Sequence, residues 1–145
     1  MANASYKNVG ASKALFKALA EARLQEFKLL AAASHFVTAV YMAGYCVEAL
    51  LKCAICKILD ADHLPVNFQL HDLEELLFLA GLAKKIQALP ETEKNFHYFS
   101  ALWKSAQLRY EDPNSPSFTV NTCNNVDKWL NDPSDGIVPW LERNI

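Results

Sequence analysis

The feature that most constrains this chain is the long apolar segment at residues 34–59, which reads SHFVTAVYMAGYCVEALLKCAICKIL. Wound at about 100° per residue, the segment carries apolar side chains around most of its circumference. A helix with so wide an apolar surface must be largely buried. Its polar side chains fall on one narrow line, the polar strip, which comprises Ser34, Thr38, Tyr41, Tyr45, Glu48 and Lys52. The polar strip is either the solvent-facing edge of a central helix or part of a functional groove.

Helical periodicity also governs the rest of the chain. Apolar residues recur three and four positions apart over residues 12–32, 72–81 and 92–108, so we expect helices there and over residues 36–59. No segment shows the sustained alternation of apolar and polar residues that is typical of a half-buried strand. The pattern predicts an all-α fold, an up-and-down helical bundle of four to six helices in a single domain, 1–145, whose first two helices form an antiparallel hairpin.

Start and stop signals mark several helix ends. Asp72, followed three residues later by Glu75, predicts an acidic variant of the capping box, and Gly81 is expected to end that helix. Thr119 is expected to cap a further helix after the loop EDPNSPS. Pro139 lacks the N–H group that a helix interior needs, so the tail around it stays unassigned.

Composition sets limits on the class of protein. Apolar residues make up 52% and charged residues 21% of the 145 residues, which is typical of a globular protein. The net charge is −2 and the pI is about 6.1, so binding of nucleic acid would need a local basic patch. The first residues form a polar lead-in rather than an export signal, and the apolar run at 36–47 is too short to cross a bilayer. We therefore expect a cytoplasmic protein that does not engage a membrane.

The four cysteines are expected to be small buried hydrophobic residues. Cys46, Cys53 and Cys56 fall on the apolar segment, and Cys123 lies far along the chain. Cys53 and Cys56 have the spacing of a redox motif, but no strand or turn accompanies them, and a zinc site would need two more ligands. We expect no metal and no cofactor.

Two pairs of polar residues are candidates for chemistry. Glu48 and Lys52 lie four residues apart with the acid first, the favourable order for a helical ion pair. They form either an ordinary surface pair or a pair that nearby tyrosines shield from water, which is costly without a purpose. His71 either packs beside the helix cap formed by Asp72 or supplies half of a metal site, and the cap is the simpler interpretation. His97 is expected to be a partly buried core residue.

Arg109 and Tyr110 stand where the helix over residues 92–108 meets the EDPNSPS loop. An arginine at this end of a helix is favoured by the helix dipole. Alternatively, its planar guanidinium binds an anion or a phosphate, and Trp103 anchors it from the core.

Three motifs together resemble the HEPN family of small α-helical bundles. They are AGYCVEALLK at residues 43–52, HDL at residues 71–73, and the spacing from Trp103 to Arg109 and Tyr110. The resemblance extends from the first expected helix to Tyr110, which is most of the chain. It implies a bundle of four or five helices, commonly a homodimer, that is associated with toxin–antitoxin, phage-defence or nucleotidyltransferase-linked systems. By position, Arg109 and Tyr110 resemble the RY motif of the non-nuclease members.

The resemblance does not extend to the ribonuclease signature of the family. Many HEPN members are metal-independent ribonucleases that carry an arginine and, four to six residues later, a histidine at the dimer interface. In this chain Arg23 is too far from His35, and neither Arg109 nor Arg143 is followed by a histidine. Without that histidine, the groups that exchange protons with the 2′-hydroxyl and the leaving oxygen are missing from their usual places.

Three functions therefore remain open. The first is a homodimeric helical module that binds a nucleotide, RNA or a partner protein through Tyr41, Tyr45, Glu48, Lys52, His71, Asp72, Arg109 and Tyr110. The second is a metal-independent ribonuclease toxin with a divergent active site, for which the substitutes would come from Tyr45, Glu48, Lys52 and His71. The third is a ligand-free interaction domain for a nucleotidyltransferase or an antitoxin. Whether the chain is an enzyme is left open by the sequence.

Overall fold

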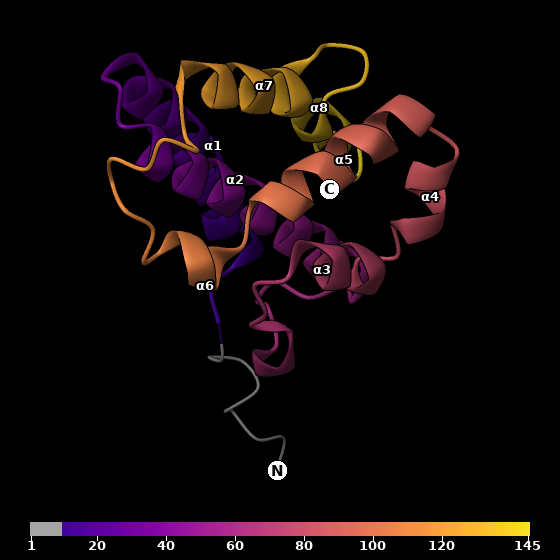
Figure 1. The fold of residues 1–145 in the computed structure, drawn as a ribbon. Helices are drawn as coiled ribbons and strands as arrows, with labels where there is room; N and C mark the ends of the chain where they lie inside the picture. Colours follow the sequence, from indigo (N-terminus) through magenta and orange to yellow (C-terminus); the bar gives the residue numbers. More distant parts are fainter. Residues whose placement is uncertain (1–9) are drawn as a thin grey trace.

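Helix α2 (Phe36–Ile58) lies at the centre of the computed structural model, which describes residues 10–145. One side of it packs along the whole of α1 (Lys13–Ala32), and Figure 1 shows the later helices gathered on its other sides. Those that contact α2 most are α3 (Leu73–Leu79), α6 (Ser105–Leu108), α7 (Val120–Asn131) and α8 (Ile137–Glu142). The all-α prediction is confirmed, because the described residues contain no strand and only an isolated bridge between Ser12 and His63.

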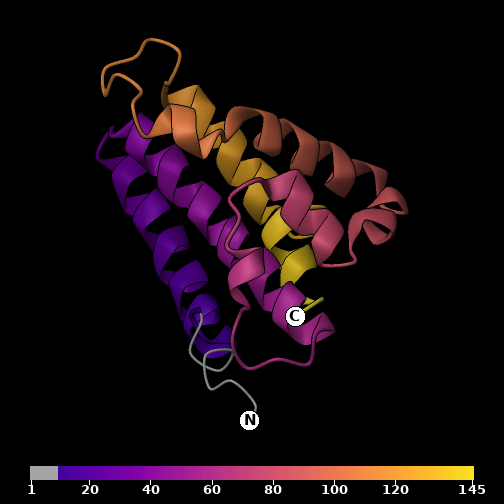
Figure 2. The same ribbon diagram turned by 90° about the horizontal axis from the view of Figure 1, so that it is seen from below.

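The antiparallel hairpin of α1 and α2 forms one edge of the molecule. Figure 2 shows the two helices side by side, with α1 outermost and the other helices beyond α2. Ser34 makes the turn between them with φ +64°, and the His35 N–H donates to the carbonyl of Leu30 at 2.9 Å. Because α1 contacts little besides α2, part of its surface stays open to a ligand.

The predicted helices over 12–32 and 36–59 are confirmed almost to the residue. The helix expected over 72–81 is shorter, because Asp72 is its cap and accepts a hydrogen bond from the Glu75 N–H at 2.9 Å. Gly81 follows it with φ +70°, the left-handed conformation that ends many helices. Thr119 caps α7 in a reciprocal capping box with Thr122, as the sequence predicts at that end.

The prediction of one helix over 92–108 is wrong. Helix α5 (Pro90–Leu102) starts two residues earlier and ends at Trp103, whose backbone is extended, and α6 begins after it. The break lets the Trp103 indole turn inward, where it is buried against α2. With this break, the short α4 (Ala83–Gln87), the 3-10 turn η2 (Val66–Phe68) and α8, the fold has more helices than the four to six predicted.

Helix α8 occupies the tail that the sequence leaves unassigned. Gly136 precedes the helix, and Pro139 is its third residue. The first turn of a helix has no intrahelical acceptor for its N–H groups, so a proline is tolerated there. Residues 1–9, which belong to the polar lead-in expected from the sequence, lie outside the described residues.

The buried side chains form one cluster around α2. Its largest fully buried members include Phe27, Phe96 and Phe99, from α1 and α5. Helix α2 is long and apolar enough to span a bilayer by length and composition, so an interruption at Glu48 does not exclude a span. The most apolar part of the helix is 83% buried by the rest of the protein, as is typical of a central helix in a globular fold.

Candidate functional site

The polar strip opens into a groove between the first two helices, which we call the α1–α2 groove. The groove has a volume of about 760 Å³. Its apolar wall includes Phe16, Leu19, Leu30 and Met42, and its polar floor is formed by Tyr41, Tyr45, Glu48 and Lys52. Four of the six residues of the polar strip therefore meet in one cavity, whereas Ser34 lies in the turn and Thr38 is exposed.

Glu48 and Lys52 form a buried ion pair. The Lys52 Nζ donates to Glu48 Oε1 at 2.6 Å, and the two side chains are only 7% and 6% exposed. The interpretation of this pair as an ordinary surface pair is therefore wrong. Burying both charges removes their hydration, a cost that favourable geometry and further hydrogen bonds must offset.

His71 supplies a further hydrogen bond to Glu48. Its Nδ1 lies 3.1 Å from Oε1 and 3.2 Å from Oε2 of the carboxylate, while the side chain is 57% exposed. Because a carboxylate accepts, Nδ1 carries the proton in this contact. Asp72 is occupied as the cap of α3. Among residues 10–145, no group of three His, Cys, Asp or Glu side chains is placed to hold a metal ion.

The two tyrosines of the floor hydrogen-bond to each other. Their hydroxyl oxygens are 2.9 Å apart, and their rings meet edge to face. Burial, followed by the bond to Tyr41, raises the pKa of Tyr45 to about 12. The bond to Tyr45 lowers the pKa of Tyr41, and the nearby Arg109 guanidinium lowers it further. The Tyr45 hydroxyl therefore stays protonated at neutral pH, and the two hydroxyls act as hydrogen-bonding groups.

Trp103 packs against the two tyrosines of the groove floor. Its indole Nε1 donates to the Tyr41 carbonyl at 3.1 Å, and its ring packs edge to face on Tyr45 at 5.6 Å. The indole lies directly on the α2 backbone at Gly44, where a Cβ atom would fall 1.8 Å from Cε2. Gly44 thus belongs to the site, and no pattern in the sequence marks it as a site residue.

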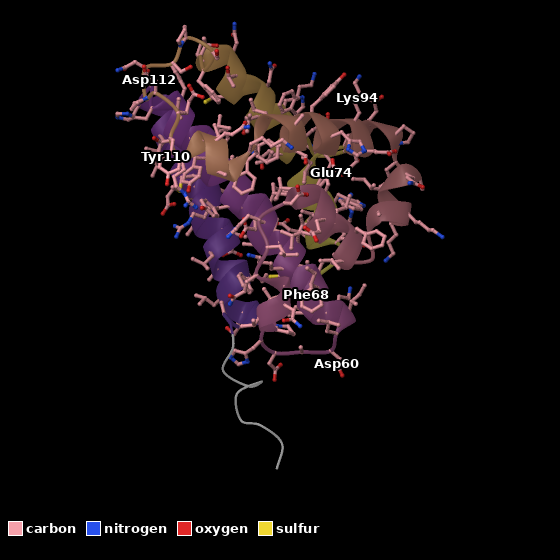
Figure 3. The ribbon with its side chains drawn as sticks, turned by 60° about the horizontal axis from the view of Figure 1, so that its bottom comes forward. Asp60, Phe68, Glu74, Lys94, Tyr110 and Asp112 are labelled. Carbon is pink, nitrogen blue, oxygen red and sulfur yellow. The ribbon has the colours of Figure 1, made fainter. Side chains whose placement is uncertain are left out.

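Arg109 lies beside the tyrosines and in solvent. The Tyr41 hydroxyl raises the pKa of the Arg109 guanidinium further above its ordinary value, so the side chain is always charged. Tyr110 is 82% exposed and lies with Asp112 at one end of the molecule, opposite Asp60 (Figure 3). The structure therefore brings Arg109 to the site and leaves Tyr110 on the outer surface.

The prediction that His97 is a core residue is wrong. Its side chain is 50% exposed, with Nδ1 2.6 Å from Glu74 and Nε2 3.4 Å from Glu93. The bond to Glu74, on a different helix, raises the pKa of His97. This cluster joins α3 to α5 and does not reach the α1–α2 groove.

The candidate binding residues predicted from the sequence include none of the α1 residues that line the groove. Phe16, Leu19 and Leu30 read as core residues of an amphipathic helix, but each is only partly buried. A second ion pair, Arg23 to Glu26 at 2.8 Å, also lies in the groove wall. The signal in the sequence is an apolar stripe on α1 that is wider than one partner helix can cover.

The cysteine prediction is confirmed, because all four thiols are buried and free. Burial raises the pKa of Cys46 to about 12 and that of Cys53 to about 11. Thiols with such pKa values are poor nucleophiles at neutral pH.

No family model, no curated protein and no solved structure matches this chain.

Proposed function

We propose that this chain is a HEPN-like helical module that binds a nucleotide, either free or as part of RNA, in the α1–α2 groove. The observation that carries the proposal is the buried Glu48–Lys52 pair on the floor of an apolar groove of about 760 Å³. Ligand sites are typically apolar cavities with a few fixed polar groups. A buried ion pair adds little net stability by comparison with apolar residues of similar size, which favours a role in binding.

A nucleotide matches the distribution of polar groups in the groove. A base has apolar faces that fit the wall and a polar edge that fits the ion pair and the tyrosine hydroxyls. Aromatic side chains such as Phe16 provide a stacking surface for a base. The exposed, permanently charged Arg109 beside Tyr41 is suited to a phosphate.

The test is calorimetric titration of the metal-stripped protein with the four nucleoside monophosphates and a short single-stranded RNA of mixed sequence. Met42→Trp should fill the groove and abolish binding. Val120→Trp, at an exposed position on α7, is the matched control and should bind as the parent does. If no ligand binds, or if both variants bind equally well, the groove is not the site.

A second candidate function, a metal-independent ribonuclease with a divergent active site, is favoured by the Glu48–His71 contact. A carboxylate that holds Nδ1 leaves Nε2 free to exchange protons, which is the arrangement of an acid–base histidine. Incubation of labelled RNA with the protein in EDTA tests it. Cleavage that His71→Gln abolishes would establish the activity, and intact RNA would leave binding as the function.

The proposal includes a homodimer in the cytoplasm, within a toxin–antitoxin, defence or nucleotidyltransferase-linked system. Its support is the HEPN resemblance and the exposed apolar side chains Leu29 and Phe78, which are 70% and 71% accessible. Sedimentation equilibrium should show a dimer at about 50 µM, and a monomer alone would contradict it. A ligand-free interaction domain, bound to a nucleotidyltransferase or an antitoxin, is the function that remains if neither nucleotide nor RNA binds.

A further inference from the structure

The Glu48–Lys52 pair can form more hydrogen bonds than it forms with the described residues. An ammonium group carries three N–H donors. Within the described part of the chain, Lys52 donates one hydrogen bond, to Glu48. Its side chain lies on the groove floor and is only 7% exposed. Two donors of a nearly buried cation are therefore available to a ligand in the α1–α2 groove.

The Glu48 carboxylate is more nearly saturated. It has about four lone-pair positions, two on each oxygen. Oε1 accepts from Lys52 at 2.6 Å and from His71 at 3.1 Å, and Oε2 accepts from His71 at 3.2 Å. One acceptor position thus remains on Oε2. The pair offers a ligand one acceptor beside two donors.

We propose that the base recognised in this groove is cytosine, an inference that rests on the proposed function. The pairing edge of cytosine presents one donor, the N4 amino group, followed by two adjacent acceptors, N3 and O2. The amino group donates to Glu48 Oε2, and N3 and the carbonyl oxygen O2 accept from the two available donors of Lys52. Uracil has the same shape and charge but presents a single donor, N3–H, between the acceptors O4 and O2, so it can place only one acceptor beside that donor and leaves one donor of Lys52 without a partner.

The purines match the pair less completely. Adenine presents an amino donor and the acceptor N1, which leaves one donor of Lys52 without a partner. Guanine presents one acceptor and two donors, whereas Glu48 has one position to receive them. The Phe16 ring centre lies 5.9 Å from Lys52 Nζ and lines the same groove, so a base held by Lys52 has an aromatic face within reach.

The experiment compares the affinities of CMP and UMP for the unmodified protein, so that no variant has to fold. CMP should bind about ten- to a hundredfold more tightly, because UMP leaves one donor of the buried Lys52 without a partner. Equal affinities, or tighter binding of UMP, would overturn cytosine recognition and leave nucleotide binding in place. Absence of binding by all four nucleoside monophosphates and by the single-stranded RNA would overturn the proposed function itself.

A double variant tests whether the Glu48–Lys52 pair is what distinguishes cytosine from uracil. Glu48→Gln with Lys52→Met removes both charges together and keeps the volume of the side chains. In this variant the ratio of CMP to UMP affinity should fall to about one. A ratio that stays as high as in the parent would show that other groups distinguish the bases. Circular dichroism of the variant confirms that it is folded.

Discussion

Glu48 and Lys52 depend on each other because both side chains are almost fully buried. Lys52→Met alone leaves the Glu48 carboxylate buried with only His71 as a partner. Breaking a buried pair in this way should lower the free energy of unfolding by about 3–5 kcal/mol. The double change with Glu48→Gln should cost less than the single change. Urea unfolding measures both, and a double variant that is less stable than the single one would contradict this expectation.

Arg109 is expected to act on binding and not on the fold. Its guanidinium is exposed beside Tyr41, where it can reach the phosphate of a nucleotide in the groove. Arg109→Ala should weaken nucleotide binding by about ten- to a hundredfold without changing the melting temperature. Arg143→Ala, an exposed arginine after α8, is the control. A fall of many degrees in the melting temperature would instead make Arg109 structural.

Helical periodicity was sufficient to place Tyr41, Tyr45, Glu48 and Lys52 on one line. It was not sufficient to decide their burial, because burial depends on α1 and on His71, which is distant in the sequence. His97 shows the same limit: an adjacent Phe96 suggests the core, but the side chain turns outward to Glu74. Whether such a side chain is buried or exposed is decided by partners from other helices, and the spacing of residues along the sequence does not identify those partners.

The approach of Trp103 to α2 requires the absence of a side chain at position 44. A Cβ atom there would lie 1.8–2.2 Å from three atoms of the indole. Gly44→Ala should therefore destabilise the protein by about 1–3 kcal/mol, although alanine is the better helix former. In a Trp103→Leu background the same substitution should cost less. Stabilisation by Gly44→Ala in the parent would show that the indole moves away freely.

The contact between α3 and α5 should depend on pH through His97. Glu74 raises the pKa of His97 in the folded protein above its unfolded value of about 6.5. The stability that this contact adds is full below pH of about 6.5 and is lost as the pH rises through the folded pKa. His97→Gln should therefore destabilise the protein more at pH 5.5 than at pH 8.5. Equal effects at both values, measured by urea unfolding, would contradict the assignment.

Among the elements, the two helix caps expected from the sequence, Asp72 and Thr119, were predicted better than the breaks. Ser12, Asp72 and Thr119 each accept a hydrogen bond from the first turn that follows, as residues of their type do. The interruption at Trp103 has no such local signal, because it arises from packing against Gly44 across the core. Tertiary contacts overrode helical periodicity there.

For the whole molecule, the apolar segment determined the architecture. A helix as apolar as α2 needs partners on nearly every side, and α1, α3, α7 and α8 provide them. The α1–α2 groove was foreseen only as an alternative, since a cavity depends on where neighbouring helices end. Residues Phe16 and Leu30 remain partly uncovered because no helix of the described chain packs over that side of the hairpin.

The claim that the α1–α2 groove binds a nucleotide is tested most directly by the indole N–H signals of the three tryptophans. Trp103 contacts Tyr41 and Tyr45 of the groove floor, whereas Trp129 and Trp140 lie on α7 and α8 and do not line the groove. During titration with CMP, followed by two-dimensional ¹H–¹⁵N NMR, the Trp103 signal should shift in proportion to occupancy while the other two stay in place. A titration in which Trp129 or Trp140 shifts and Trp103 does not would contradict the claim.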